Sequence, residues 1–161
     1  MANRLTLDSD KILPSPNEKA SAAAEYVVFV VDDEIVISTT LSIILRRAGF
    51  KAFSFTHPKQ AIAASQLIEP DLLISDVSMP EMTGIELAVH FRQAQSQCRI
   101  LLFSGQAETT DLLKHARNDG YDFDLVHKPI HPLDLLAKCN AWRGSKSHRL
   151  ANSRGSSTAE T

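Results

Sequence analysis

The chain has 161 residues and a formal net charge of −2, a balance that excludes a strongly basic nucleic-acid-binding surface. Hydrophobic residues make up 43% of the sequence, enough for the core of one domain. Two cysteines, Cys98 and Cys139, are too few for a disulfide scaffold, and no apolar run is long enough to cross a bilayer. We therefore expect a cytoplasmic protein with buried free thiols, no nucleic-acid partner and no membrane insertion.

The first strand and helix follow a polar arm. Residues 1–24 show no apolar periodicity and predict a flexible N-terminal arm, so the ordered domain is predicted over residues 25–143. The run Tyr26–Val31 lacks polar alternation, which is typical of a parallel strand buried on both faces. A helix with an apolar stripe from Ile37 to Ala48 follows, and Gly49 ends it.

The next strand–helix pairs repeat this alternation. Lys51–Phe55 alternates like an edge strand, and the helix opened by His57-Pro58 is predicted to end at Glu69-Pro70. The third strand is predicted over Asp71–Ser75, and the third helix from about Gly84 to Gln95.

The second half of the chain predicts two more pairs. Ile100–Phe103 is typical of a buried strand, and a polar helix is predicted over Glu108–Asn118. Phe123–Val126 has polar flanks like an edge strand, and the last helix is predicted over Pro132–Trp142. The polar composition of residues 144–161 predicts a disordered tail, too short to form a DNA-binding or catalytic output domain.

Five strands that alternate with five helices predict an α/β fold, a flavodoxin-like (βα)5 three-layer sandwich around a five-stranded parallel sheet. The continuously apolar first, third and fourth strands belong at the centre, and the mixed second and fifth strands at the edges, which gives the order 2-1-3-4-5. The helix positions predicted to face the core are Ile37, Leu41, Ile44, Leu45, Ala48, Ala61, Ala64, Ile68, Leu87, Ala88, Phe91, Ala94, Leu112, Leu113, Ala116, Leu135, Cys139 and Trp142.

Polar side chains follow four of these strands: Asp32 and Asp33, then Asp76, Ser104 and Lys128. Because the carboxyl ends of parallel strands meet at one edge of the sheet, we expect these side chains to converge. Three close carboxylates repel one another, and a hard cation with oxygen ligands, Mg²⁺ rather than zinc, relieves that repulsion. Lys128 and Mg²⁺ could neutralise a phosphoryl group, Ser104 could donate a hydrogen bond to it, and Asp76 could be the nucleophile that forms an acyl phosphate.

Simpler interpretations exist for each residue taken singly. Asp76 and Ser104 could each cap a following helix, and Lys128 could be an ordinary solvated lysine. The six histidines show no metal-ligand spacing and are interpreted as surface residues. Leu133 and Ala137 lie off the main stripe of the last helix and either serve a partner or pack at the edge of the core.

Four motifs at strand ends carry a family resemblance: Val30-Val31-Asp32-Asp33-Glu34, Asp76-Val77-Ser78-Met79-Pro80-Glu81-Met82-Thr83-Gly84, Phe103-Ser104-Gly105 and His127-Lys128-Pro129. With these motifs, residues 25 to about 143 resemble the receiver domain of bacterial two-component response regulators, and chemotaxis-type single-domain receivers in particular. The resemblance implies that Asp76 is the phosphoacceptor for a histidine kinase or a histidine phosphotransfer protein. It also implies Mg²⁺ held directly by Asp33, Asp76 and the backbone carbonyl of Ser78, and through water by Asp32.

The resemblance further implies that Ser104 is the switch hydroxyl, that Lys128 contacts the phosphoryl group, and that the Lys128–Pro129 peptide bond is cis. The sequence departs from the family three residues before this lysine, where an aromatic side chain usually stands. Leu125 occupies that position, so the phosphorylation chemistry is implied but the usual relay to the last two helices is not.

We therefore expect a stand-alone receiver, not an enzyme on external substrates, that catalyses only its own phosphorylation and dephosphorylation. Phosphorylation is expected to change the surface of the fourth helix, fifth strand and fifth helix toward an unknown output protein. The alternative is a receiver-shaped interaction module that works without phosphorylation. A phosphatase is a third reading, but the related phosphatases carry a second acid two residues after the nucleophile, where this chain has Ser78.

Overall fold

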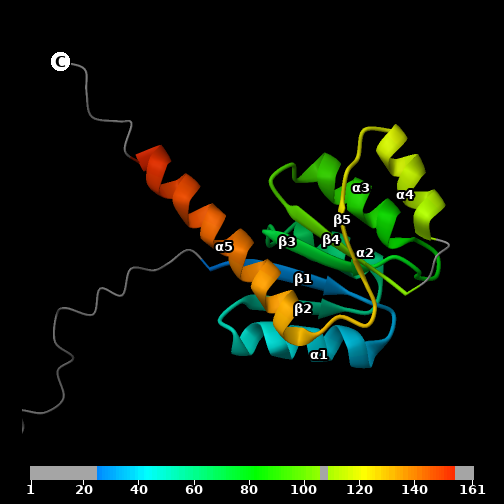
Figure 1. Ribbon diagram of the computed structural model, residues 1–161, viewed down its shortest axis with the longest axis horizontal. Coiled ribbons are helices and arrows are strands. Elements are labelled where there is room, and N and C mark those ends of the chain that lie inside the picture. The colour runs from blue at the N-terminus through cyan, green and yellow to red at the C-terminus, as the bar shows by residue number, and fades with distance from the viewer. Residues whose placement is uncertain (1–24, 106–108, 155–161) are drawn as a thin grey trace, which may run out of the picture.

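The computed structural model describes residues 25–105 and 109–154, so the predicted N-terminal arm and residues 155–161 lie outside the described residues. Strands and helices alternate along this part of the chain (Figure 1): β1 (Val27–Val31), α1 (Ile35–Arg47), β2 (Lys51–Phe55), α2 (Pro58–Ser65), β3 (Leu72–Asp76), α3 (Gly84–Ala94), β4 (Arg99–Ser104), α4 (Thr109–Asn118), β5 (Asp124–His127) and α5 (Pro132–Arg154). All paired strands are parallel and stand in the order β2-β1-β3-β4-β5, so the predicted fold class and strand order are confirmed.

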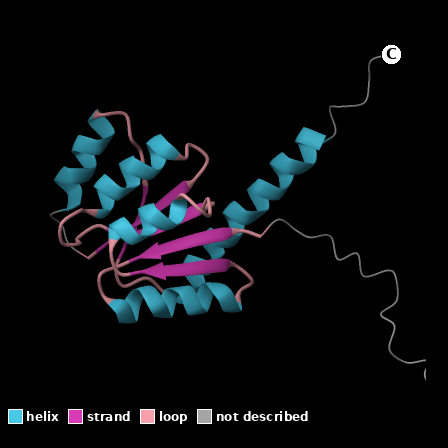
Figure 2. Cartoon of the chain, turned by 180° about the vertical axis from the view of Figure 1, so that it is seen from behind, coloured by secondary structure: helices cyan, strands magenta, loops and turns pink. Residues whose placement is uncertain are grey.

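Two hydrophobic cores lie on opposite faces of the sheet. Successive side chains of a strand point to opposite faces, so Phe29 of β1 belongs to the core shared with α2, α3 and α4, and Val28 to the core shared with α1 and α5. Helices cover both faces of the sheet (Figure 2). This two-sided cover explains why the central strands are apolar runs without alternation. The edge strands β2 and β5 are partly exposed, as their mixed sequences predict. Both cysteines are buried and unoxidised, as expected.

Local signals position the helices that frame the sheet. Thr83 and Glu86 form a reciprocal capping box at the start of α3, which satisfies amides that the first helical turn leaves free. His57 caps α2 by accepting a hydrogen bond from the amide of Lys59, with Pro58 in the first turn. Gly49, at φ 84°, ends α1 in the left-handed conformation that glycine adopts without strain.

The first four helices differ from the sequence prediction in their packing or length. The buried residues of α1 are Ser38, Ser42 and Leu45. The Ser42 side chain can be buried because its hydroxyl donates to the Ser38 carbonyl (2.9 Å) and so needs no water as a partner. The predicted end of α2 at Glu69-Pro70 is wrong, since the helix ends at Ser65 and the following residues turn into β3. Predicted core positions that the structure places at the surface are Ile68, Ala94 and Leu112.

The predicted end of the last helix at Trp142 is also wrong, because α5 continues to Arg154 through residues assigned to the tail (Figure 1). The residues after Trp142 form no apolar stripe, which is why their composition predicts disorder. Contacts made by Arg143 and Lys146 nevertheless hold the first turn after Trp142 in place. Arg143 lies over the Phe50 ring, 4.1 Å from its centroid, and Lys146 pairs with Asp71, the residue before β3. The predicted stripe of Leu135, Cys139 and Trp142 does face the core.

Candidate functional site

Three of the predicted site residues meet at the carboxyl edge of the sheet. The Lys128 Nζ lies 2.9 Å from Asp32 Oδ2 and 2.7 Å from Asp76 Oδ1, so one ammonium joins the ends of β1, β3 and β5. Asp32 is 2% exposed and Asp76 is 7% exposed, which makes this a partly buried ionic cluster. The predicted convergence is confirmed for these three residues.

Backbone hydrogen bonds between neighbouring strand ends hold the cluster in place. The Val77 amide donates to the Phe103 carbonyl (2.9 Å), and the Lys128 amide donates to the Ser104 carbonyl (2.8 Å). Ser104 is therefore a direct neighbour of Lys128, and its side chain is buried. The Lys128–Pro129 peptide bond is cis, as the resemblance implies.

The other two predicted ligands lie at the rim. The Ser78 amide donates to the Asp76 carboxylate, so the β3–α3 loop contacts the site through its backbone. Asp33 lies in the exposed turn between Asp32 and α1. Asp32 is already engaged on both oxygens, since its Oδ1 accepts the Glu34 amide (2.9 Å) and its Oδ2 contacts Lys128.

Burial and charge pairing shift the pKa values of Asp76 and Lys128 in opposite directions. Burial raises the pKa of Asp76, and the hydrogen bond and charge of Lys128 only partly offset this, while the Asp32 charge raises the pKa further. Burial alone would lower the pKa of Lys128, but hydrogen bonds and charges from Asp76 and Asp32 outweigh burial and raise it. The site therefore favours a protonated lysine and raises the pH at which Asp76 ionises.

A magnesium site is assembled only in part. Within residues 25–105 and 109–154, no three His, Cys, Asp or Glu side chains are grouped so as to hold a metal ion. The donor chemistry nevertheless fits a hard cation, because the Asp32 and Asp76 carboxylates carry two negative charges against the single ammonium of Lys128.

A second set of contacts beside the site had no signal in the sequence. Glu81, in the β3–α3 loop, pairs with His57 and Lys59 at the start of α2. From the sequence, His57 is interpreted only as a surface residue. The two segments are 24 residues apart, and no local motif links them.

Leu125, at the position of the usual aromatic residue, is half-buried and packs in the core cluster shared with Leu113 and Ala116 of α4. It is paired in register with Leu102 of β4. The aliphatic side chain therefore joins β5 to the packing beneath α4 without presenting a polar tip.

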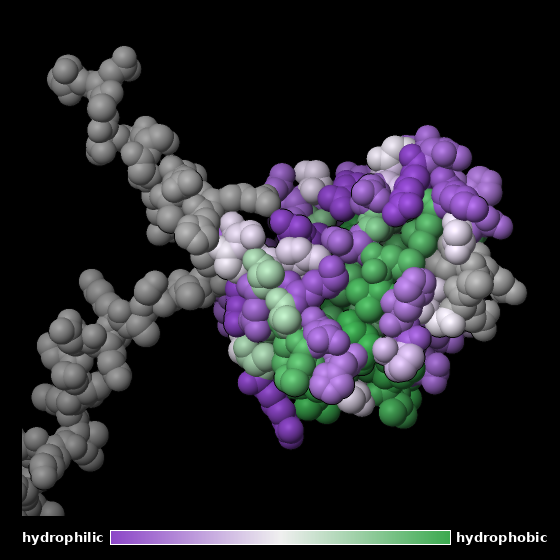
Figure 3. All heavy atoms as spheres, viewed as in Figure 1, coloured by the Kyte–Doolittle hydropathy of each residue, from purple (hydrophilic) through white to green (hydrophobic). Residues whose placement is uncertain are grey.

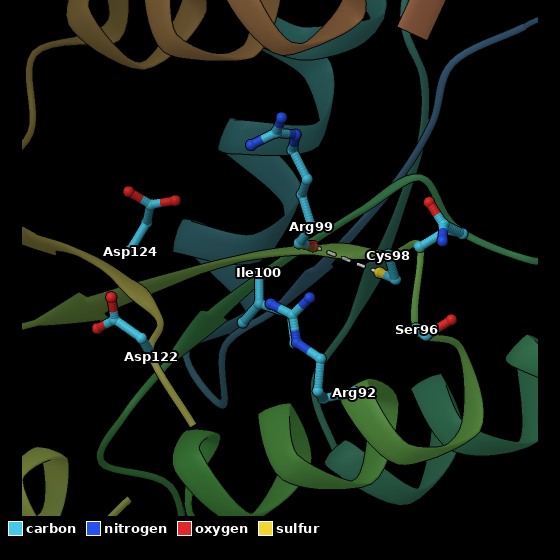
Figure 4. A pocket seen from close by; sticks show the side chains of 8 residues that line it. Arg92, Ser96, Cys98, Arg99, Ile100, Asp122 and Asp124 are labelled. Carbon is cyan, nitrogen blue, oxygen red and sulfur yellow. Dashed lines mark hydrogen bonds between the residues drawn. The ribbon is translucent and has the colours of Figure 1, made fainter. Parts of the chain in front are cut away.

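At the opposite edge of the sheet, a polar cavity of about 170 Å³ is lined by residues around the start of β4 (Figure 4). Arg92, Arg99, Asp122 and Asp124 are among the residues that line it (Figure 4). The Arg92 guanidinium also lies over Phe123, and that of Arg99 over Trp142. The two cations are thus engaged in packing the edge of the sheet.

Comparisons with known proteins agree with this geometry. A family model described as the response regulator receiver domain matches residues 28–140. The DNA-binding response regulator MtrA of Mycolicibacterium smegmatis is 31% identical over 114 residues, which are 71% of this chain and 49% of that protein. The transcriptional regulatory protein PgtA of the phosphoglycerate transport system of Salmonella typhimurium is 30% identical over 112 residues, 70% of this chain and 26% of that protein. The chain thus spans about half or less of the length of these curated relatives.

Solved structures give the same result. Chemotaxis protein CheY4 of Vibrio cholerae superposes with a TM-score of 0.65 at 28% identity, over 73% of this chain and 98% of that one. A receiver domain protein from Clostridium thermocellum, at 20% identity over 75% of this chain and 96% of that one, has a TM-score of 0.66 and shows the fold alone. Taken with the family match, these findings show that the chain belongs to the response regulator receiver domain family.

Proposed function

We propose that this receiver accepts a phosphoryl group on Asp76 from a histidine kinase or a histidine phosphotransfer protein, and that phosphorylation switches a protein-interaction surface. The observation that carries the proposal is the contact of one ammonium, Lys128, with both Asp32 and Asp76 at the carboxyl edge of the sheet. A buried carboxylate beside a cation is a suitable acceptor, because the cation stabilises the charge that phosphoryl transfer brings to the site.

In the proposed reaction, an Asp76 carboxylate oxygen attacks the phosphorus of a phosphohistidine. The O–P bond forms, the P–N bond breaks, and the imidazole that leaves takes up a proton. Lys128 would move from pairing two carboxylates to contacting the transferred oxygens, and the Ser104 hydroxyl would donate to one of them.

Asp33, Asp76 and the Ser78 carbonyl are the proposed direct holders of Mg²⁺, with Asp32 acting through water. Bound there, Mg²⁺ would supply positive charge against the phosphoryl oxygens. Catalysis would be limited to the receiver's own phosphorylation and dephosphorylation, so the protein is not proposed to be an enzyme on external substrates.

Exposed aliphatic side chains near the site support a protein partner. Ile35 and Val36, 64% and 72% exposed, begin α1 directly after the Asp32–Glu34 turn, and Leu133, 67% exposed, begins α5 soon after Lys128. A helical phosphodonor domain with a complementary apolar face would bury them as it brings its histidine to Asp76. No helix in the described part of the chain is long and apolar enough to cross a membrane. The proposed place of action is the cytoplasm, where kinases take phosphoryl groups from ATP.

The proposed switch surface lies on the face shown in Figure 3. Hydrophobic side chains form a band there that runs from α4 across β5 to the first turns of α5 and α1 (Figure 3). Leu125 and Val126 of β5 and Ile130 before α5 are half-buried. Because Lys128 follows this strand directly, a shift of Lys128 toward a phosphoryl group would reach the band with few intervening contacts.

The test is phosphorylation by phosphoramidate in the presence of MgCl₂, followed by intact-mass measurement. The unsubstituted protein should gain one phosphoryl group, Asp76→Asn should gain none, and chelation of Mg²⁺ should stop the reaction. Asp124→Asn, a change at an exposed carboxylate of β5, is the matched control and should react normally. Labelling that persists in Asp76→Asn would refute the assignment, and the absence of labelling in the unsubstituted protein would favour the phosphorylation-independent module.

A further inference from the structure

The β3–α3 loop contains a strained residue beside the proposed site. Glu81 has φ 65°, and it is the only non-glycine residue with positive φ in the part of the chain that the structure describes. The Met82 amide donates to the Pro80 carbonyl at 2.7 Å, which closes a three-residue γ-turn centred on Glu81. Positive-φ γ-turns are rare and strained, and glycine adopts them most readily. A glutamate persists in this conformation only when surrounding contacts hold it there.

The contacts of the Glu81 carboxylate meet that requirement. Its Oε2 lies 3.2 Å from His57 Nε2 and 3.1 Å from Lys59 Nζ, both at the start of α2. The Lys59 amide donates to His57 Nδ1 at 3.2 Å, so Nδ1 is an acceptor and Nε2 carries the proton that His57 donates to Glu81. The hydrogen bond and charge of Lys59, followed by the hydrogen bond from His57, lower the pKa of Glu81, so the carboxylate stays charged.

These contacts, which we name the Glu81 clamp (Glu81, His57 and Lys59), join the loop that carries Ser78 to a helix on the same face of the sheet. Ser78 lies three residues before Glu81, and its amide donates to the Asp76 carboxylate. At its other end the loop is held by the Gly84 amide, which donates to the Val77 carbonyl at 2.9 Å. The clamp therefore ties the turn between these two points to the neighbouring helix α2 through side chains.

We propose that Glu81 is a positioning residue of the phosphorylation site: its pairing with His57 and Lys59 fixes the β3–α3 loop so that the Ser78 backbone stays against Asp76. The inference rests on the proposed function, because the loop it fixes carries a proposed Mg²⁺ ligand.

The variant that separates positioning from folding is Glu81→Gly. Glycine relieves the strain at φ 65° while it removes both contacts, so the variant should unfold at the same urea concentration as the unsubstituted protein or a higher one. Glu81→Gln keeps the acceptor oxygen and is the conservative variant. Asp122→Gly is the matched control, because it removes an exposed ion pair of the same kind, with Arg117 at 3.2 Å, at the opposite edge of the sheet.

The first measurement is hydrogen exchange of the metal-free proteins. Glu81→Gly should speed exchange of the amides from Ser78 to Met82 by about fivefold or more, whereas Asp122→Gly should leave them unchanged. The second is calorimetric titration with MgCl₂, in which Glu81→Gly should weaken binding by about five- to tenfold and Glu81→Gln should restore most of the affinity. The rate of phosphorylation by phosphoramidate should fall in parallel.

Each outcome separates the inference from the proposed function. Unchanged exchange in Glu81→Gly overturns the clamp, whatever the protein does with Mg²⁺. Faster exchange with unchanged Mg²⁺ affinity overturns the positioning role and leaves the proposed function intact. Failure of the unsubstituted protein to bind Mg²⁺ or take up a phosphoryl group overturns the proposed function, and the positioning role with it.

Discussion

Because Gly84 has no side chain, the backbone of Asp76 can pack directly against it. A Cβ placed on Gly84 would lie 1.9 Å from the Asp76 carbonyl oxygen and 3.0 Å from the Ser75 hydroxyl. The first residue of α3 therefore packs directly against the end of β3. The Ser75 hydroxyl, which donates to that same carbonyl oxygen at 2.9 Å, completes the contact. Glycine is needed here for close approach rather than for a positive φ.

Gly84→Ala should therefore damage the site more than the fold. The methyl group must displace backbone, since no flexible side chain stands in its way, and we expect a loss of about 2–3 kcal/mol in the free energy of unfolding. Urea unfolding measures this loss, and the phosphorylation rate of Asp76 should fall with it. Gly144→Ala in α5 is the control, because its Cβ meets no atom within 4 Å and should stabilise the helix slightly. Equal stability of the two variants would contradict the close approach.

Asp76→Asn should stabilise the protein near neutral pH. The pKa of Asp76 in the folded state is raised above its ordinary value of 3.8, chiefly by burial. Stability is therefore lost as the pH rises through the folded-state pKa, and the amide removes that loss. Thermal unfolding should show a higher midpoint for Asp76→Asn at pH 7 and a shrinking difference as the pH falls toward 3.8. A difference that grows in acid would mean that the pKa is lowered instead.

Lys128→Met should destabilise the protein because it leaves Asp32 and Asp76 close together without a cation. We expect a loss of about 2 kcal/mol at pH 7, below the range for fully buried pairs, since the Lys128 side chain is 24% exposed. Because the pKa of Lys128 is raised above its ordinary value of 10.5, the lysine stabilises the folded state fully at pH values below 10.5. This stabilisation is lost as the pH rises through the folded-state pKa.

The control for Lys128→Met is Lys138→Met, whose exposed partner Asp124 lies 3.8 Å away and which should change stability by less than about 0.5 kcal/mol. Combining Lys128→Met with Asp76→Asn should recover part of the loss, because one of the facing charges is then absent. If the two substitutions simply add, the contact at 2.7 Å carries no coupling.

Arg143→Ala should loosen the extended part of α5. Its guanidinium lies 4.1 Å from the Phe50 ring centroid, and Nη1 donates to the Ala48 carbonyl at 3.3 Å. Loss of both contacts should lower the free energy of unfolding by about 1 kcal/mol. Amide exchange should quicken from Gly144 toward Arg154 while the core strands stay protected. Uniform protection along α5 in the variant would show that the extension is held by other means.

The sequence alone determined the strand order and the convergence of Asp32, Asp76 and Lys128. Central strands buried on both faces must be continuous apolar runs and edge strands need not be, so β1, β3 and β4 could be told from β2 and β5 by composition. Parallel strands then place Asp32, Asp76 and Lys128 at one edge wherever the helices end. This follows from topology and does not depend on side-chain detail.

The tertiary structure decided what depends on contacts between distant segments. The continuation of α5 past Trp142 depends on Phe50 and Asp71, and the role of His57 depends on Glu81. The close approach that requires Gly84 depends on how α3 packs on β3. None of these relations has a period or spacing along the chain, because each is set by which surfaces the folded sheet brings together. Local patterns fix which elements form, but only packing fixes which side chains touch.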